Sequence, residues 1–98
     1  MTSDARQFDR CEQAMYGVLR VHWRAKLAMR VTGKTEAELE NFARNCMLWT
    51  EDTYNAGTMD VAVLRAKVRE KCKQEYGSIL VAILFAVLWE IIKAWLFN

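Results

Sequence analysis

The sequence contains no proline, only four glycines and a single histidine among its 98 residues. Proline and glycine interrupt helices most strongly, and the chain is rich in good helix formers such as alanine, leucine, glutamate, lysine and arginine. The composition, 53% hydrophobic and 27% charged, argues against a disordered chain. The length corresponds to one domain. The sequence therefore predicts a folded, largely helical protein.

Cysteine is also scarce. Cys11, Cys46 and Cys72 are odd in number and far apart, and none belongs to a Cys-x-x-Cys pair, so neither a disulfide framework nor a zinc site is indicated. The first residues include no apolar segment of the secretory type. We therefore expect an intracellular protein whose cysteines are small core residues, with no metal and no other cofactor.

Signatures of catalysis are lacking as well. Thr32-Gly33-Lys34-Thr35 contains the last part of a phosphate-binding loop, but Ala28 occupies the position of the first glycine. A helix end followed by a helix cap explains these four residues. The lone histidine, His22, has no nucleophile or carboxylate at a diagnostic spacing, and we interpret it as a hydrogen-bonded core or interface residue. We expect no enzyme activity and no small-molecule substrate.

The most distinctive stretch that is present runs from Ser78 to Asn98. Its residues Ile79–Trp89 carry no charge, and a helix that is apolar on all sides must be buried in protein or lipid. About 20 apolar residues suffice to span a bilayer, although Glu90 and Lys93 interrupt the stretch. A chain this small has little other apolar surface with which to wrap such a helix. A membrane helix and the core of a protein assembly both remain open.

Three groups of residues accompany this stretch. Small or polar residues recur every fourth position and would form a narrow strip that contacts another helix: Ser78, Ala82, Ala86, Glu90 and Ala94. A basic flank precedes it, as the positive-inside rule expects on a cytoplasmic side: Arg65, Lys67, Arg69, Lys71 and Lys73. Aromatic residues stand near its ends, resembling the aromatic belts at membrane interfaces: Tyr76, Trp89, Trp95 and Phe97.

Apolar periodicity predicts an all-α fold, a small bundle of three amphipathic helices plus a hydrophobic C-terminal helix. The helices are expected near residues 4–31, 35–55, 59–76 and 78–97, with residues 1–77 as a helical domain and 78–98 as an anchor or oligomer core. Thr2, Ser3 or Asp4 would cap the first helix, and Gly33 would end it. Thr35 and Glu38 form a capping-box pattern. Gly77 leaves open whether the last two helices are continuous or bent.

Charge changes sign along the chain. The segments 1–34, 35–60 and 61–98 carry net charges of +4, −5 and +3, an order that suits an acidic middle helix between two basic neighbours. The basic faces of the first and third helices also raise the alternative of a nucleic-acid-binding module. Glu70 and Glu75 dilute the second of these faces, so that alternative is the weaker one.

In general organisation, chiefly the stretch YGSILVAILFAVLWEIIKAW, the chain resembles small accessory proteins encoded by phages. That resemblance assigns no role to any residue. Together with the apolar C-terminal stretch, it leads us to expect a structural or assembly protein that forms homo-oligomers or joins a larger complex such as a virion. Membrane association, with the basic flank on the cytoplasmic side, is the other expected location.

Overall fold

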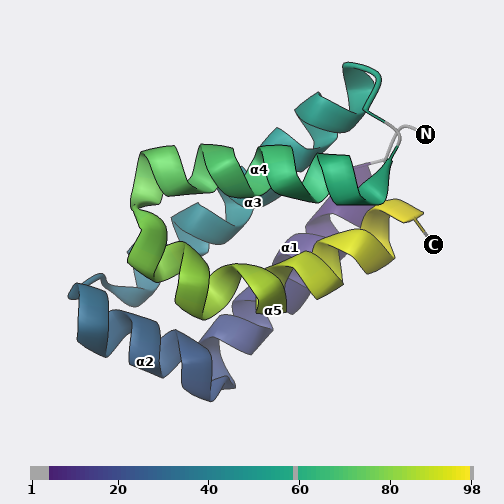
Figure 1. Ribbon diagram of the computed structural model, residues 1–98. Coiled ribbons are helices and arrows are strands. Elements are labelled where there is room, and N and C mark those ends of the chain that lie inside the picture. The colour runs from purple at the N-terminus through teal and green to yellow at the C-terminus, as the bar shows by residue number, and fades with distance from the viewer. Residues whose placement is uncertain (1–4, 59, 98) are drawn as a thin grey trace.

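A computed structural model describes residues 5–58 and 60–97, and this part of the chain forms five helices and no strand. They are α1 (Ala5–Val21), α2 (Trp23–Thr32), α3 (Glu36–Asn55), α4 (Val61–Tyr76) and α5 (Ser78–Phe97). Helices α4 and α5 lie in front of α3 and α1, and α2 lies at the lower left edge (Figure 1). The predicted all-α class is confirmed.

The first long helix that the sequence predicts is in fact two helices. His22 has an extended backbone with ψ 136°, and its imidazole Nδ1 accepts a hydrogen bond from the Arg24 backbone N–H at 3.0 Å. His22 is thus the N-cap of α2, half-buried rather than a core residue. Neither proline nor glycine causes the break. The turn instead lets α2 pack against α5, α1 and α3, so tertiary contacts override the local helix preference.

The other helix ends follow their local signals. Gly33 has the left-handed φ of 72° and closes α2, and Thr35 with Glu38 forms the full capping box of α3. Asp60 caps α4 by accepting hydrogen bonds from the next turn. Gly77, with φ 90°, separates α4 from α5 and settles the open alternative in favour of a sharp bend. The expected cap at residues 2–4 and the expected start at residue 59 lie outside the described residues.

The core of the bundle is organised around α5, which contacts all four other helices. One side of α5 is buried, and its buried residues are Leu80, Val81, Leu84, Phe85, Leu88, Trp89, Ile92 and Leu96. The other helices add their apolar rows, among them Met15, Phe42 and Leu64. The three cysteines are buried in this core, as expected. The small chain covers one side of its most apolar helix and leaves the other side in solvent.

We expect Leu88→Ala to lower the free energy of unfolding by about 2–5 kcal/mol, because truncation of a fully buried leucine leaves a cavity. The matched control is Ile79→Ala in the same helix. Ile79 is 59% exposed, and its truncation should change the free energy by less than about 0.5 kcal/mol. Chemical denaturation followed by circular dichroism measures both. Equal and small losses would contradict the packing of α5 in the bundle.

We expect His22→Ala to lower the free energy of unfolding by about 1 kcal/mol, because α2 loses its N-cap acceptor. His22→Asn should retain most of the stability, since asparagine is a good N-cap residue. Thermal unfolding of both variants makes the comparison. An equal loss in both would instead assign the contribution of His22 to its ring, which stacks on Trp23 at a centroid distance of 6.0 Å.

Candidate interaction surface

The predicted contact strip lies on the uncovered side of α5. Its five residues, Ser78, Ala82, Ala86, Glu90 and Ala94, are all exposed. Along one edge run three half-buried branched residues, Ile83, Val87 and Ile91. Ile79, a large hydrophobic residue in the first turn of the helix, is 59% exposed. The uncovered side of α5 is therefore smooth, mostly apolar and continuous from one end of the helix to the other.

Charge is confined to one end of this surface. The Glu90 carboxylate lies 3.1 Å from the Lys93 ammonium, and the Glu90 side chain is 70% exposed. An exposed pair at this spacing contributes at most a few tenths of a kcal/mol. Glu90 is thus free to exchange Lys93 for another cation when a partner approaches.

The basic flank on α4 divides into two sides. The Arg65 guanidinium lies 5.3 Å above the Phe85 ring of α5, whereas the Lys71 ammonium lies 5.6 Å from the Trp49 ring of α3. Lys71 also pairs with Glu75, and Lys73 pairs with Glu70. The five basic residues therefore do not form one patch, and two of them are matched by neighbouring carboxylates.

The four aromatic residues near the ends of α5 take part in the packing of the bundle. Trp89 is 3% exposed and stacks on Phe85. Phe97 meets Tyr54 edge to face, and Tyr76 packs on Phe42 and Trp49. The Tyr76 hydroxyl accepts hydrogen bonds from the side-chain amides of two α3 residues, Asn41 and Asn45. In this arrangement the aromatic residues join α5 to its neighbours, and their role at a membrane interface stays a prediction.

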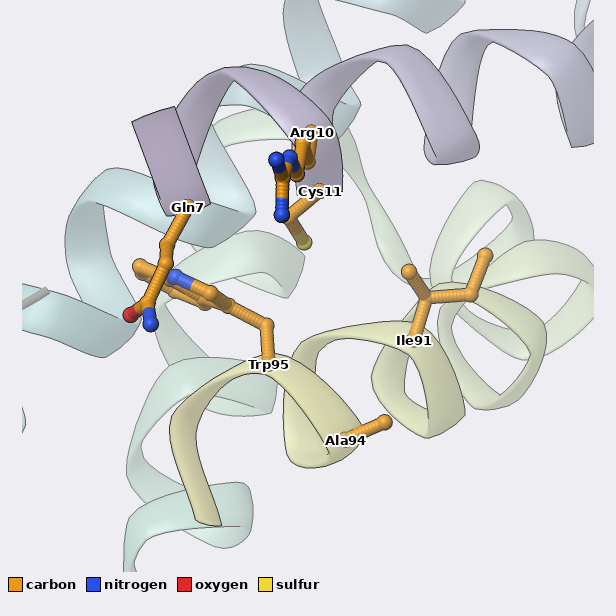
Figure 2. Close-up of a pocket in the computed structure, with 6 residues that line it drawn as sticks. All are labelled: Gln7, Arg10, Cys11, Ile91, Ala94 and Trp95. Atoms are coloured by element: carbon orange, nitrogen blue, oxygen red, sulfur yellow. The ribbon is translucent and has the colours of Figure 1, made fainter. Parts of the chain in front are cut away.

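A cavity of about 350 Å³ opens where the strip ends, between α1 and the last turns of α5. Figure 2 shows Arg10 and Cys11 of α1 on one side of it and Ile91, Ala94 and Trp95 on the other, with Gln7 beside the indole. The indole N–H of Trp95 is buried without a hydrogen-bond partner among the described residues. The lining is mainly apolar, so the cavity suits a small apolar side chain with Arg10 at its border.

Neither Cys11 nor Cys46 has the lowered thiol pKa of a nucleophile. Burial, and to a lesser degree the adjacent Glu12 carboxylate, raises the pKa of Cys11 to about 12. Burial also raises the pKa of Cys46, whose sulfur lies 3.3 Å from that of Cys72. Both groups are protonated at neutral pH, whereas nucleophilic cysteines need a depressed pKa. In the part of the chain that the structure describes, no group of three potential metal ligands gathers.

The sequence analysis missed a partly buried ionic contact between α1 and α3. The Arg44 guanidinium on α3 donates to both Glu12 carboxylate oxygens on α1, at 2.8 and 2.7 Å, and the Tyr16 hydroxyl donates to the same carboxylate. The sequence contains a signal for this contact. Arg44 is the one basic residue of the acidic segment 35–60. It pairs with an acidic residue of the basic first segment, just as Arg20 pairs with Glu36 and Glu40 at 3.5 Å.

No protein-family model matches the chain, and no curated protein or solved structure is significantly similar to it. By length and composition α5 could cross a membrane. A core helix of a soluble bundle meets the same criterion, and α5 is packed as one along its buried side.

The raised pKa values of Cys11 and Tyr16 predict that the fold loses stability at alkaline pH. The unfolded chain releases its thiol protons from about pH 9 upward, whereas the fold holds the Cys11 proton to about pH 12. The unfolded state then binds fewer protons, so the free energy of unfolding falls as the pH rises through this range. Tyr16, whose pKa burial and its hydrogen bond to Glu12 raise to about 12, acts in the same direction.

The measurement is denaturation under reducing conditions at several pH values between about 8 and 11. The variant Cys11→Ala should show a shallower decline with pH than the natural sequence, whatever its stability at neutral pH. Comparing slopes rather than absolute stabilities separates the ionisation from the cavity that the substitution leaves. An unchanged slope would mean that Cys11 ionises as readily in the folded state as in the unfolded one.

Proposed function

We propose that this protein is a non-enzymatic structural or assembly protein that associates with itself through the uncovered side of α5. The observation that carries the proposal is the exposure of all five strip residues on a helix whose opposite side is the centre of the core. The monomer leaves a continuous, mostly apolar helix surface in solvent. Covering such a surface supplies the driving force for association.

A second copy of the chain suits this surface for steric reasons. Alanine and serine at every fourth position allow two helix backbones to approach closely, and the same strip on a second copy is equally smooth. A two-fold axis relates identical surfaces in a homodimer. Contact between two α5 strips therefore needs no other partner, and the half-buried Ile83, Val87 and Ile91 would border it.

Charge favours an antiparallel arrangement of the two strips. A parallel pair in register would place the two Glu90 carboxylates side by side, and like charges at that distance repel. An antiparallel pair centred on Ala86 instead places Glu90 beside Ala82 of the second copy and Ser78 beside Ala94. The carboxylates are then separated along the helix, and each keeps Lys93 as a partner.

Such a unit would act as a building block of a homo-oligomer or of a larger complex such as a virion. An intracellular location agrees with the buried, unpaired cysteines. The raised thiol pKa values support a non-enzymatic role, because they leave Cys11 and Cys46 as protonated core residues. Insertion of α5 into lipid is the less favoured location, because it would expose to lipid the helix side that now forms the core.

The alternative function, nucleic-acid binding by the basic faces of the first and third predicted helices, finds less support. Several of these cations already have carboxylate partners: Arg20 has Glu36 and Glu40, Lys71 has Glu75, and Lys73 has Glu70. Phosphate binding would have to displace those pairs. A backbone-tracking site usually presents its cations together, whereas α4 directs Arg65 and Lys71 to different sides.

Substitution of the strip tests the proposal. We expect Ala86→Glu to weaken self-association at least about tenfold, because a carboxylate buried between two helices without a partner costs more than 1 kcal/mol. Ala86 is exposed in the monomer, so the monomer should remain folded. The matched control is Ala66→Glu, which places the same charge at an exposed alanine of α4. Sedimentation equilibrium gives the association constant of each form.

Removal of α5 is a poorer test than substitution. A chain ending at Gly77 would lack eight buried core residues and would lose its fold together with any association. The substitution separates the two, and circular dichroism checks that helix content is retained. A natural chain that stays monomeric at all measurable concentrations, or an Ala86→Glu variant that associates as strongly as Ala66→Glu, would contradict the proposal.

A further inference from the structure

A second surface, separate from the strip, lies on α2. The segment 20–34 contains five basic residues and no acidic one. Trp23, Lys26 and Arg30 are spaced three and four residues apart in α2 and therefore share one face. All three residues are exposed, and the exposed fraction of Trp23 is 61%. Val31, which is 53% exposed, and the half-buried Leu27 lie on the adjacent row.

The charges of this surface have no acidic counterpart among residues 5–58 and 60–97. Arg20 and Lys34, just outside α2, pair with carboxylates of α3. Lys26 and Arg30 make no ion pair with any residue that the structure describes. The outer face of α2 is consequently positive without internal compensation.

The bundle holds this surface firmly in place. Ala25 and Ala28, on the opposite face of α2, are completely buried. The Arg24 guanidinium donates a hydrogen bond to the Ile83 carbonyl oxygen of α5 at 3.2 Å and also lies 4.9 Å from the centre of the Trp23 ring. In Figure 1, α2 occupies the edge of the molecule, with no helix beyond it. The exposed Trp23 ring therefore contacts both the Arg24 guanidinium and the His22 ring.

We propose that the outer face of α2, formed by Trp23, Lys26, Leu27, Arg30 and Val31, binds the surface of an anionic lipid bilayer. Lysine and arginine attract anionic headgroups, and tryptophan partitions to the headgroup region. Aliphatic residues on the adjoining row enter the acyl boundary. Cations and apolar side chains on one exposed helix face are the combination that a lipid surface requires.

Other partners fit this surface less well. A second copy of the same face would bring Lys26 and Arg30 against the same cations, which repel. A nucleic-acid backbone would satisfy the cations, but it offers nothing apolar to Val31 and Leu27. The contact proposed here is peripheral and uses the folded bundle, so α5 keeps its place in the core. It is independent of self-association through the strip.

Vesicle co-sedimentation tests this contact on the full chain. We expect binding to vesicles that contain phosphatidylglycerol and none to vesicles of phosphatidylcholine alone. Lys26→Gln and Arg30→Gln should each weaken binding about fivefold, since one cation near an anionic surface contributes about 1 kcal/mol. Lys67→Gln on α4 is the matched control. It removes the same charge from an exposed lysine that forms no ion pair in the described residues, and it should leave the affinity nearly unchanged.

Trp23 supplies a second, independent measurement. Lipids brominated on their acyl chains quench tryptophans that enter the bilayer surface, and we expect this quenching in the natural chain. Trp23→Phe should abolish most of it, because Trp89 is buried and Trp49 and Trp95 are partly covered. Ala86→Glu, the strip variant, should be quenched as the natural chain is.

Several outcomes would overturn the proposal. The first is that the protein does not bind phosphatidylglycerol vesicles even at low salt. The second is that it binds neutral vesicles equally well. The third is that Lys67→Gln and Lys26→Gln lower the affinity for anionic vesicles by the same factor. Competition by duplex DNA that depends on Lys26 and Arg30, with no quenching of Trp23 by brominated lipid, would assign the surface to nucleic acid instead.

Discussion

The burial of α5 is the constraint on which the remaining structure depends. Its apolar residues cannot be covered by any single neighbour, and each of the other four helices contacts it. The bend at Gly77 folds α5 back on α4, and the break at His22 allows α2 to lie along its first half. Burial of apolar surface is favourable in proportion to the area removed from water, and α5 contributes eight buried residues to the core.

The charges of the helices favour particular helices as neighbours. The acidic helix α3 packs between α1 and α4, both of which are basic. The Glu12–Arg44 contact joins a buried residue of α1 to an arginine of α3 whose side chain is 47% exposed, and the Glu12 carboxylate receives three hydrogen bonds. The more exposed pairs contribute little to stability but disfavour other arrangements of the helices.

Because the chain is short, covering one side of α5 leaves two surfaces of different character in solvent. The strip on α5 is made mostly of small residues, carries one charge, that of Glu90, and has the shape that another helix would need. The outer face of α2 is basic, carries the most exposed tryptophan and is suited to an anionic surface. The two proposals therefore concern separate helices. An assembly protein with both surfaces would form oligomers through one and approach a membrane through the other.

The sequence by itself determined the helical class, the capping box at Thr35, the end of α2 at Gly33 and the presence of an apolar helix at 78–97, because these depend on local backbone preferences and on periodicity. It could also identify the strip, since four-residue spacing fixes a helix face. Only the tertiary structure decided the break at His22, where contacts of α2 with α5 outweigh an uninterrupted helical pattern. It also decided which side of α5 faces solvent, and it assigned Trp89 to the core and Trp23 to the surface. Those outcomes depend on which helices meet, and periodicity within one segment contains no information about its neighbours.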